Sequence, residues 1–366
     1  MSSALVNAEA PNSGRAAVAV PAVSPLGNSP FIASRSYDLT FFILSPLLAL
    51  ALSYAIGLFR WPFEAAAGLG TVQPRVLFFG LVWTNAHLFA VVFRSHANAQ
   101  IFNRHRLRFT AVPGAVAAAI LLSDWALVVA GVLAALWDVY HTSMQTFGFC
   151  RIYDSKRGNS PERGRMLDVW INHVIYIGPI LGGLSLMTTI EDVQGFTGLG
   201  WNAPARLYSW VAETQPMIRS VVLVAGTAFC CYYVCAYWRL LRTGYVVSWQ
   251  KVTLLVSTAI TSIYAWGFLP PLEAFFVANF FHALQYYAIV WWTEKKTITR
   301  VFGLSRLAGG QVAALAAYLV VITAVGIFMA STPAVGGRFV AAAALTISLM
   351  HFWYDSFVWS VRRHEV

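Results

Sequence analysis

The chain has 366 residues, of which 58% are hydrophobic and 11% are charged, and its mean hydropathy is +0.63. So few charged side chains cannot cover a water-soluble globule of this size, which excludes an ordinary soluble, disordered or fibrous protein. The formal charge of +10 is typical of the cytoplasmic loops of a membrane protein, and we expect no nucleic-acid partner. The composition therefore predicts an all-α, polytopic membrane helix bundle.

The chain divides into two short tails and one long apolar region. Residues 1–35 are rich in Ala, Ser, Pro and Asn and predict a disordered cytoplasmic tail, while residues 362–366 form a short basic tail. Between them, residues 36–361 alternate apolar runs with short polar breaks, as expected for a transmembrane domain of about ten helices. The predicted spans are 39–59, 76–93, 109–123, 125–149, 168–188, 218–240, 252–269, 272–293, 310–331 and 337–360.

The distribution of Lys and Arg predicts the orientation of these spans. With the N-terminus in the cytoplasm, only five of the 25 basic residues fall on the outer side, namely Arg60, Arg75, Arg206, Arg219 and Arg338. A missed helix would invert every later loop and remove this asymmetry, so the pattern favours ten spans with both termini cytoplasmic. We expect a multi-pass protein of a bacterial inner (plasma) membrane.

Five of the eight histidines fall inside predicted spans, where ionisable groups are costly and usually have a partner or a function. They are His87, His141, His173, His282 and His351, each on a different helix. Their distances along the chain to the nearest cytoplasmic basic residue correspond to depths of about 10 to 20 Å. The five side chains are therefore predicted to occupy one slab in the inner half of the membrane. Whether His96, just beyond a span, joins them is left open.

Three of these histidines have polar residues three or four positions away, which places them on the same face of the helix. These are Asp138 and Gln145 around His141, Asn279 and Gln285 around His282, and Asp355 after His351. Aromatic residues cover much of the rest of the same helices. The pattern predicts polar stripes that point into the bundle.

Neutral imidazoles that converge from several helices are suitable ligands for iron, copper, zinc or haem. We predict a metal site built from the five intramembrane histidines, with non-haem iron as the leading cofactor and haem, copper or zinc as alternatives. Asp138 and Asp355 are the predicted catalytic carboxylates, as ligands or as groups that orient an imidazole. Asn279, Gln145 and Gln285 are predicted to face the substrate or to support the ligands. The alternative for each histidine is a buried hydrogen bond between helices.

The arrangement resembles, in general plan, the Brp/Blh-type carotene-cleaving oxygenases, which are polytopic, depend on iron and take histidines from different helices. It differs from membrane desaturases and hydroxylases, because no two of the intramembrane histidines share a helix and no HxxxH or HxxHH box is present. Membrane haem proteins such as haem A synthase also carry single histidines on separate helices, but no axial-ligand motif can be matched. The resemblance implies an iron-dependent oxygenase and assigns no individual residue.

The sequence thus predicts a metal-dependent membrane oxygenase or oxidoreductase that acts on a lipid or isoprenoid substrate. The expected partners are that lipophilic small molecule, membrane lipid and a redox partner. A proton-coupled transporter that uses the same His and Asp residues is the alternative from another class. A haem-binding membrane protein is a third hypothesis.

Overall fold

The computed structural model describes residues 29–56, 74–331 and 337–359, and these residues form helices and no strand. The predicted all-α fold is confirmed for this part of the chain. The elements are α1 (Arg35–Asp38), η1 (Leu39–Ile43), α2 (Ser45–Ala55), α4 (Pro74–Ser95), α5 (Ala99–Arg104), α6 (Arg106–Leu122), α7 (Asp124–Lys156), α8 (Arg165–Gly182), α9 (Ser185–Val193), η2 (Gln194–Leu199), α10 (Ala203–Arg242), α11 (Trp249–Phe268), α12 (Pro271–Val301), α13 (Gly310–Ser331) and α14 (Gly337–Val358).

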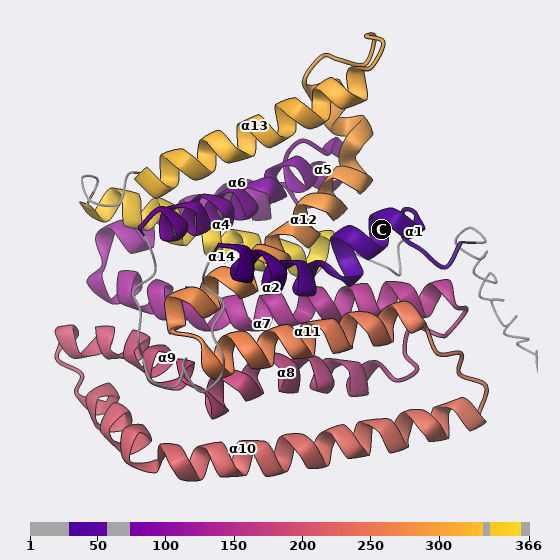
Figure 1. The fold of residues 1–366 in the computed structure, drawn as a ribbon. Coiled ribbons are helices and arrows are strands. Elements are labelled where there is room, and N and C mark those ends of the chain that lie inside the picture. Colours follow the sequence, from indigo (N-terminus) through magenta and orange to yellow (C-terminus); the bar gives the residue numbers. More distant parts are fainter. Residues whose placement is uncertain (1–28, 57–73, 332–336, 360–366) are drawn as a thin grey trace, which may run out of the picture.

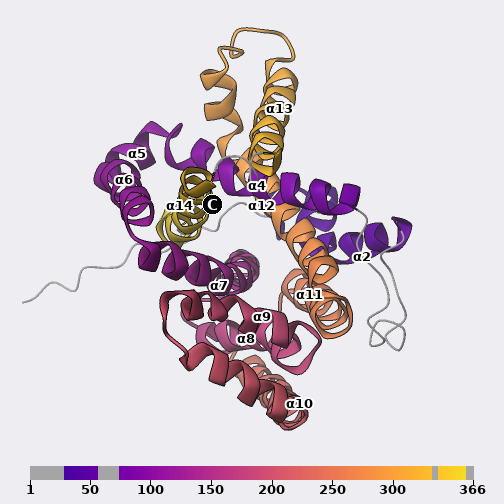
Figure 2. The same ribbon diagram turned by 90° about the vertical axis from the view of Figure 1, so that its left-hand side faces the viewer.

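The long helices form a bundle. Helices α7, α8, α10 and α11 run side by side, with the α7–α8 and α10–α11 loops at one end and α9 at the other (Figure 1). Seen end-on, α7 lies between α14 and the layer of α8 and α10 (Figure 2). Helices α4, α12 and α13 lie on the side of the bundle opposite to α8 and α10. Each predicted span coincides with one helix, with two exceptions. The first corresponds to η1 and α2, and the span 168–188 covers most of α8 and the start of α9.

By length and apolar composition, three helices of the described chain are able to cross a membrane by themselves: α7, α10 and α13. Two bent pairs bring the number to five if each pair forms one span: α1–η1 with α2, bent by 62°, and α8 with α9–η2, bent by 91°. The protein therefore has the helices of a membrane protein. The finer prediction of ten spans is taken up under the proposed function.

Two predicted boundaries can be compared directly with the helices. The predicted spans 109–123 and 125–149 are almost adjacent, and the structure has a tight junction there. Ser123 follows the last residue of α6, and its hydroxyl accepts a hydrogen bond from the Ala126 amide at the start of α7. By contrast, α10 begins at Ala203 and passes through Pro216, whereas the predicted span begins only at residue 218. Helical hydrogen bonds do not require apolar side chains, so this helix extends beyond its apolar run.

The last residues of the predicted N-terminal tail, 29–35, make specific contacts in the structure. The backbone amides of Ile32 and Ala33 donate to the Asp38 carboxylate at 2.6 and 2.9 Å, and the Gln250 side chain donates to the Pro30 carbonyl. Buried Asp38 thus fixes the segment just before α1, which the composition alone assigns to the tail. Residues 1–28 and the predicted C-terminal tail at 362–366 lie outside the described residues.

Helix α12 is the centre of the bundle. Its buried residues contribute to both hydrophobic cores, one shared with α2, α7, α8 and α11 and the other with α4, α6, α13 and α14. On the second side, Gly326 of α13 lies so close to α4 that an added Cβ would stand 2.3 Å from the Val82 carbonyl oxygen. This close contact holds α4 between α12 and α13. A polar group on α12 is therefore surrounded by other helices.

Candidate metal centre

Four of the five predicted histidines meet in the interior of the bundle. His87 comes from α4, His141 from α7, His282 from α12 and His351 from α14. The ring centroid of His87 lies 4.5 Å from that of His282 and 4.4 Å from that of His351. The His141 centroid lies 5.0 and 4.9 Å from the same two rings. The rings therefore form a four-sided cluster, with His87 and His141 at opposite corners, 6.2 Å apart.

These imidazoles are buried and incompletely paired. None of the four is more than 5% exposed. Both ring nitrogens of His87 and both of His282 have no hydrogen-bond partner among the described residues. A buried polar group without a partner costs about 1–3 kcal/mol, so a native cluster of this kind calls for an additional partner.

His351 is oriented by the backbone. Its Nδ1 atom lies 3.1 Å from the carbonyl oxygen of Leu88, which can only accept a hydrogen bond, so Nδ1 carries the proton. The Nε2 atom then presents its lone pair toward His141, whose own Nε2 is 3.3 Å away. A backbone contact that fixes the tautomer of an imidazole is the usual support of a metal-binding histidine.

Asp355 adds a carboxylate one turn after His351. Its Oδ1 atom accepts hydrogen bonds from the Tyr286 hydroxyl at 2.8 Å and from the Trp359 indole at 3.0 Å. Its Oδ2 atom lies 3.7 Å from His351 Nε2 and 3.9 Å from His141 Nε2. One oxygen is therefore held by the protein while the other faces the histidines, which is the arrangement of an oriented ligand.

Two overlapping groups have the spacing of metal ligands. The ligand atoms of His87, His141 and His282 lie within 4.8 Å of one another, as do those of His141, His351 and Asp355. Because His141 belongs to both groups, the simplest arrangement is one shared centre. The cluster combines imidazole nitrogen with a carboxylate oxygen, a donor set that suits iron, zinc or copper better than magnesium or calcium.

A buried ion pair contacts Trp359, the residue whose indole donates to Asp355. Arg94 of α4 donates to the Glu294 carboxylate of α12 at 2.5 Å, and Asn98 donates to both oxygens of the same carboxylate. The Arg94 guanidinium carbon also lies 4.5 Å from the centre of the Trp359 ring. The cation over the ring and the indole hydrogen bond on its edge fix Trp359, and with it Asp355.

The predicted amides act mainly between helices. Gln145 on α7 donates to the His282 carbonyl and to the Gln285 side chain, both at 3.0 Å, and Gln285 donates to the Phe42 carbonyl. These bonds connect α7, α12 and η1 next to the cluster. The Gln145 oxygen has no partner among the described residues, so this side chain retains one acceptor.

Asp138 and Asn279 lie one helical turn away from the histidines. They stand three residues before His141 and His282, which corresponds to about 4.5 Å along each helix. Both line a small separate cavity with Thr142 and Tyr176, and Asn279 hydrogen-bonds the Asp138 carboxyl. The structure groups Asp355, and not Asp138, with the possible metal ligands.

His173 also lies apart from the cluster. Its Nδ1 atom is 3.1 Å from the Ser143 hydroxyl, and its ring stacks on Tyr140 at 5.5 Å. Both ring nitrogens of His96 are engaged, one by the Ser95 hydroxyl and the other by the Phe109 carbonyl. The structure therefore brings together His87, His141, His282, His351 and Asp355, and leaves His173 and His96 outside.

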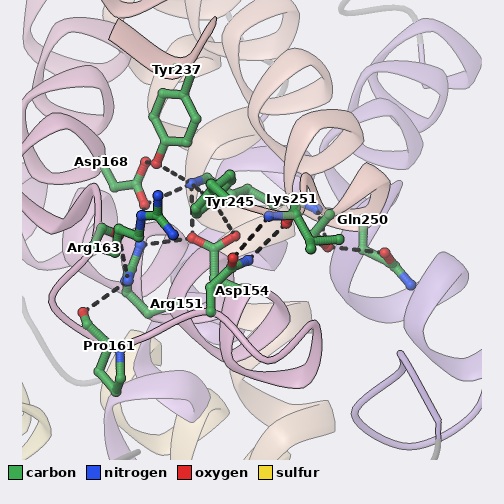
Figure 3. Close-up of polar contacts among 12 residues, drawn as sticks. Arg151, Asp154, Pro161, Arg163, Asp168, Tyr237, Tyr245, Gln250 and Lys251 are labelled. Carbon is green, nitrogen blue, oxygen red and sulfur yellow. Dashed lines mark hydrogen bonds and ion pairs between the residues drawn. The ribbon is translucent and has the colours of Figure 1, made fainter. Parts of the chain in front are cut away.

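A second buried polar cluster was not predicted from the sequence. Arg151 and Lys251 each contact the carboxylates of both Asp154 and Asp168, at 2.6–2.9 Å (Figure 3). Three tyrosines complete it: Tyr233 and Tyr237 donate to Asp168, and Tyr245 donates to Asp154. Its charges balance and its carboxylates are fully engaged, which indicates a structural junction of α7, α8, α10 and α11. The spacing of Tyr233 and Tyr237 on one helix face was the available sequence signal.

A cavity of about 710 Å³ lies beside the histidines. His141, Tyr286 and Asp355 line one part of it, and Arg151, Glu162 and Arg165 line another. Aromatic side chains form much of the wall between: Trp137, Tyr140, Phe147, Phe149, Phe352 and Trp359. The candidate ligands His141 and Asp355 are therefore within reach of a molecule in this cavity.

Comparison with known proteins finds no matching family model, no matching curated protein and no matching solved structure.

Proposed function

We propose that the protein is a metal-dependent membrane oxidoreductase, most simply a non-haem iron oxygenase, that acts on a lipophilic substrate. The ion is held by His87, His141, His282 and His351, with Asp355 as the carboxylate ligand. The observation that supports this proposal most strongly is the four buried imidazoles, of which two lack any hydrogen-bond partner among the described residues. A single ion would supply a partner for one nitrogen of each ring.

The donor set narrows the choice of cofactor. The described cysteines lie elsewhere, with Cys150 buried and Cys230, Cys231 and Cys235 exposed, so an iron–sulfur centre is not favoured. Ring centroids only 4.4–5.0 Å apart leave no space for a porphyrin between the imidazoles. When bound, iron in such a site supplies redox chemistry with dioxygen, while zinc would supply Lewis-acid chemistry.

The chain itself contributes orientation and access. His351 is held by the Leu88 carbonyl, and Asp355 is held by Tyr286 and Trp359, so both ligands keep their geometry in the absence of substrate. The other side of the cluster is closed, since His87 and His282 are buried and do not line the cavity. A substrate therefore approaches from the His141 and Asp355 side, through a cavity with largely aromatic walls.

We further propose that the helices form ten spans of a multi-pass protein, with both termini in the cytoplasm of a bacterium. The support is the asymmetry of basic residues together with the coincidence of each predicted span with a helix or helix pair. Polar residues within some of these helices, such as Asn279, His282 and Gln285 on α12, lower the mean hydropathy of the helix without changing its length. A redox partner would approach the basic cytoplasmic face.

The test is elemental analysis combined with an absorption spectrum of the purified protein. Stoichiometric iron without a Soret band supports the proposal, whereas a Soret band would indicate haem. Stoichiometric zinc or copper would keep the centre and change its chemistry. The absence of any bound metal after mild purification and metal supplementation would contradict the proposal and favour a proton-coupled transporter built on the same histidines.

A further inference from the structure

We propose that the cavity beside the histidines binds a single-chain amphiphile, an extended hydrocarbon or isoprenoid chain that ends in a carboxylate. The carboxylate lies near Arg165, and the chain runs along α7 toward His141. The evidence for this binding site is the geometry of the cavity. The inference that the bound molecule is the substrate rests, in addition, on the proposed function. Four features of the cavity lead to this ligand.

The cavity is elongated along one helix. Seven of its lining residues on α7 are Trp137, Tyr140, His141, Met144, Gln145, Gly148 and Arg151, spaced three or four positions apart. This spacing is one continuous face of an α-helix. From Trp137 to Ile152 the stripe covers about 22 Å at the usual rise per residue.

The cavity has the volume and the lining for a hydrocarbon chain. Its volume of about 710 Å³ is spread along this length of α7, which suits an extended ligand. Phe147 and Phe149 of α7 and Phe352 of α14 line it, so its walls are suited to hydrocarbon.

The two ends of the cavity differ in charge. Trp137 and Tyr140 line the end that is farther from Arg165. Pro161, Glu162 and Arg165 are exposed and line the other end, which therefore opens to solvent. Arg151 lies there too, but its Nη atoms are bound to Asp154, Asp168 and backbone carbonyls. Arg165 lies over the Phe147 ring at 5.7 Å and makes no ion pair with the carboxylates of the described chain. Its guanidinium is thus the cation available to a carboxylate, next to the apolar wall.

The distance between these ends defines where the chain meets the candidate ligands. Arg165 lies over Phe147, which is six residues beyond His141 on α7. The same end of the cavity is lined by Arg151, ten residues beyond His141. Those separations correspond to about 9 to 15 Å along α7. A ligand anchored by its carboxylate therefore presents an interior chain position, and not its terminal group, to His141 and Asp355.

One glycine allows the cavity to be blocked without disturbing the ligands. Gly148 lines the cavity between His141 and Arg151, and an added Cβ there meets no atom within 4 Å. Gly131 lies on the same helix, also has open space at its Cβ, and does not line the cavity. Gly148→Leu and Gly131→Leu are therefore a matched pair, both of which increase the helix propensity of α7.

The experiment measures binding of a fluorescent long-chain polyene carboxylic acid to the full-length protein in nanodiscs, by energy transfer from tryptophan. Wild type and Gly131→Leu should bind the probe with the same affinity, and Gly148→Leu should weaken binding at least tenfold. Arg165→Gln should weaken binding of the acid several-fold and leave binding of the matching alcohol unchanged. Glu162→Gln is the control at the same end and should not weaken binding of the acid.

The outcomes separate this site from the metal centre. Equal probe binding by Gly148→Leu and Gly131→Leu would overturn the proposed site, as would a two-chain phospholipid that remains bound in the purified protein and is lost only in Gly148→Leu. Equal loss of acid and alcohol in Arg165→Gln would overturn the role of the carboxylate. Metal content is measured on the same samples. A Gly148→Leu protein that keeps its metal but loses the probe would support the binding site. A protein that binds the probe but contains no metal would refute the proposed function and leave the binding site intact.

Discussion

The Nε2 atoms of His141 and His351 lie 3.3 Å apart inside the bundle, although the two residues are 210 positions apart in the chain. Since His351 Nδ1 donates to Leu88, its Nε2 atom faces His141 as a bare lone pair. Two lone pairs at this distance repel unless a proton or an ion lies between them. The adjacent unpaired rings of His87 and His282 favour an ion, because one proton cannot serve four imidazoles.

Replacing either of these histidines should remove the metal. His141→Ala and His351→Ala are each expected to lose stoichiometric metal, because each removes a ligand from a small set. His173→Ala is the matched control, since this ring belongs to the same predicted slab and contacts Ser143 and Tyr140 instead. The measurement is the metal-to-protein ratio of purified protein. If both ligand variants kept full metal and activity, the rings would only form interhelical hydrogen bonds worth about 0.6 kcal/mol each.

Removing the Tyr286 hydroxyl should weaken metal binding without abolishing it. Tyr286→Phe deletes one of the two hydrogen bonds to Asp355 Oδ1, so the carboxylate loses part of its orientation. Loss of such a supporting contact typically costs 10- to 100-fold in metal affinity, and we expect a change of about that size. Tyr287→Phe is the control, because its hydroxyl donates to the Trp83 carbonyl. Competition with a chelator measures both, and equal affinities would contradict the role of Tyr286.

The second polar cluster should govern stability and leave the metal site intact. Lys251→Met leaves the buried carboxylates of Asp154 and Asp168 short of one cation, which costs about 3–5 kcal/mol. The expected result is a much lower Tm, with unchanged metal content in the folded fraction. Asp124→Asn breaks the exposed pair with Arg338, which keeps its hydrogen bonds to the Ile120 carbonyl, and should cost at most about 1 kcal/mol. Similar Tm values for the two variants would show that the cluster does not hold the helices together.

Reporter fusions test the proposed orientation. Fusions after residues 160 and 244 lie in the loops that follow α7 and α10, at the same end of the bundle, and should both report the cytoplasm (Figure 1). A fusion after residue 205, at the start of α10, should report the opposite side. A result that places residues 160 and 205 on one side of the membrane would contradict the ten-span topology.

The sequence pattern does not separate the four histidines that meet in the structure from His173, which lies apart. Counting residues from basic loops fixes the depth of a side chain, but it does not fix the rotation of a helix about its own axis. On α8, neighbouring Asn172 is fully buried, whereas His173 is only partly buried beside Ser143. That rotation depends on packing against α10 and α11, which no pattern within α8 encodes.

The two predicted carboxylates differ for a related reason. Asp138 precedes its histidine by three positions, and Asp355 follows its histidine by four. Since α7 and α14 run in the same direction, the two carboxylates lie on opposite sides of the histidine layer. Each carboxylate lies on the same helix face as its histidine. Only Asp355 has hydrogen bonds from Tyr286 and Trp359 that orient it toward the imidazole rings.

X-ray absorption spectroscopy of the purified protein tests whether one metal ion is bound by imidazoles from four helices. The expected result is a shell of nitrogen and oxygen atoms at about 2.0–2.2 Å with the outer-shell scattering of several imidazoles. His173→Ala should show the same pattern. A shell of sulfur atoms at about 2.3 Å, or a bound metal without imidazole scattering, would contradict the proposed four-helix metal site.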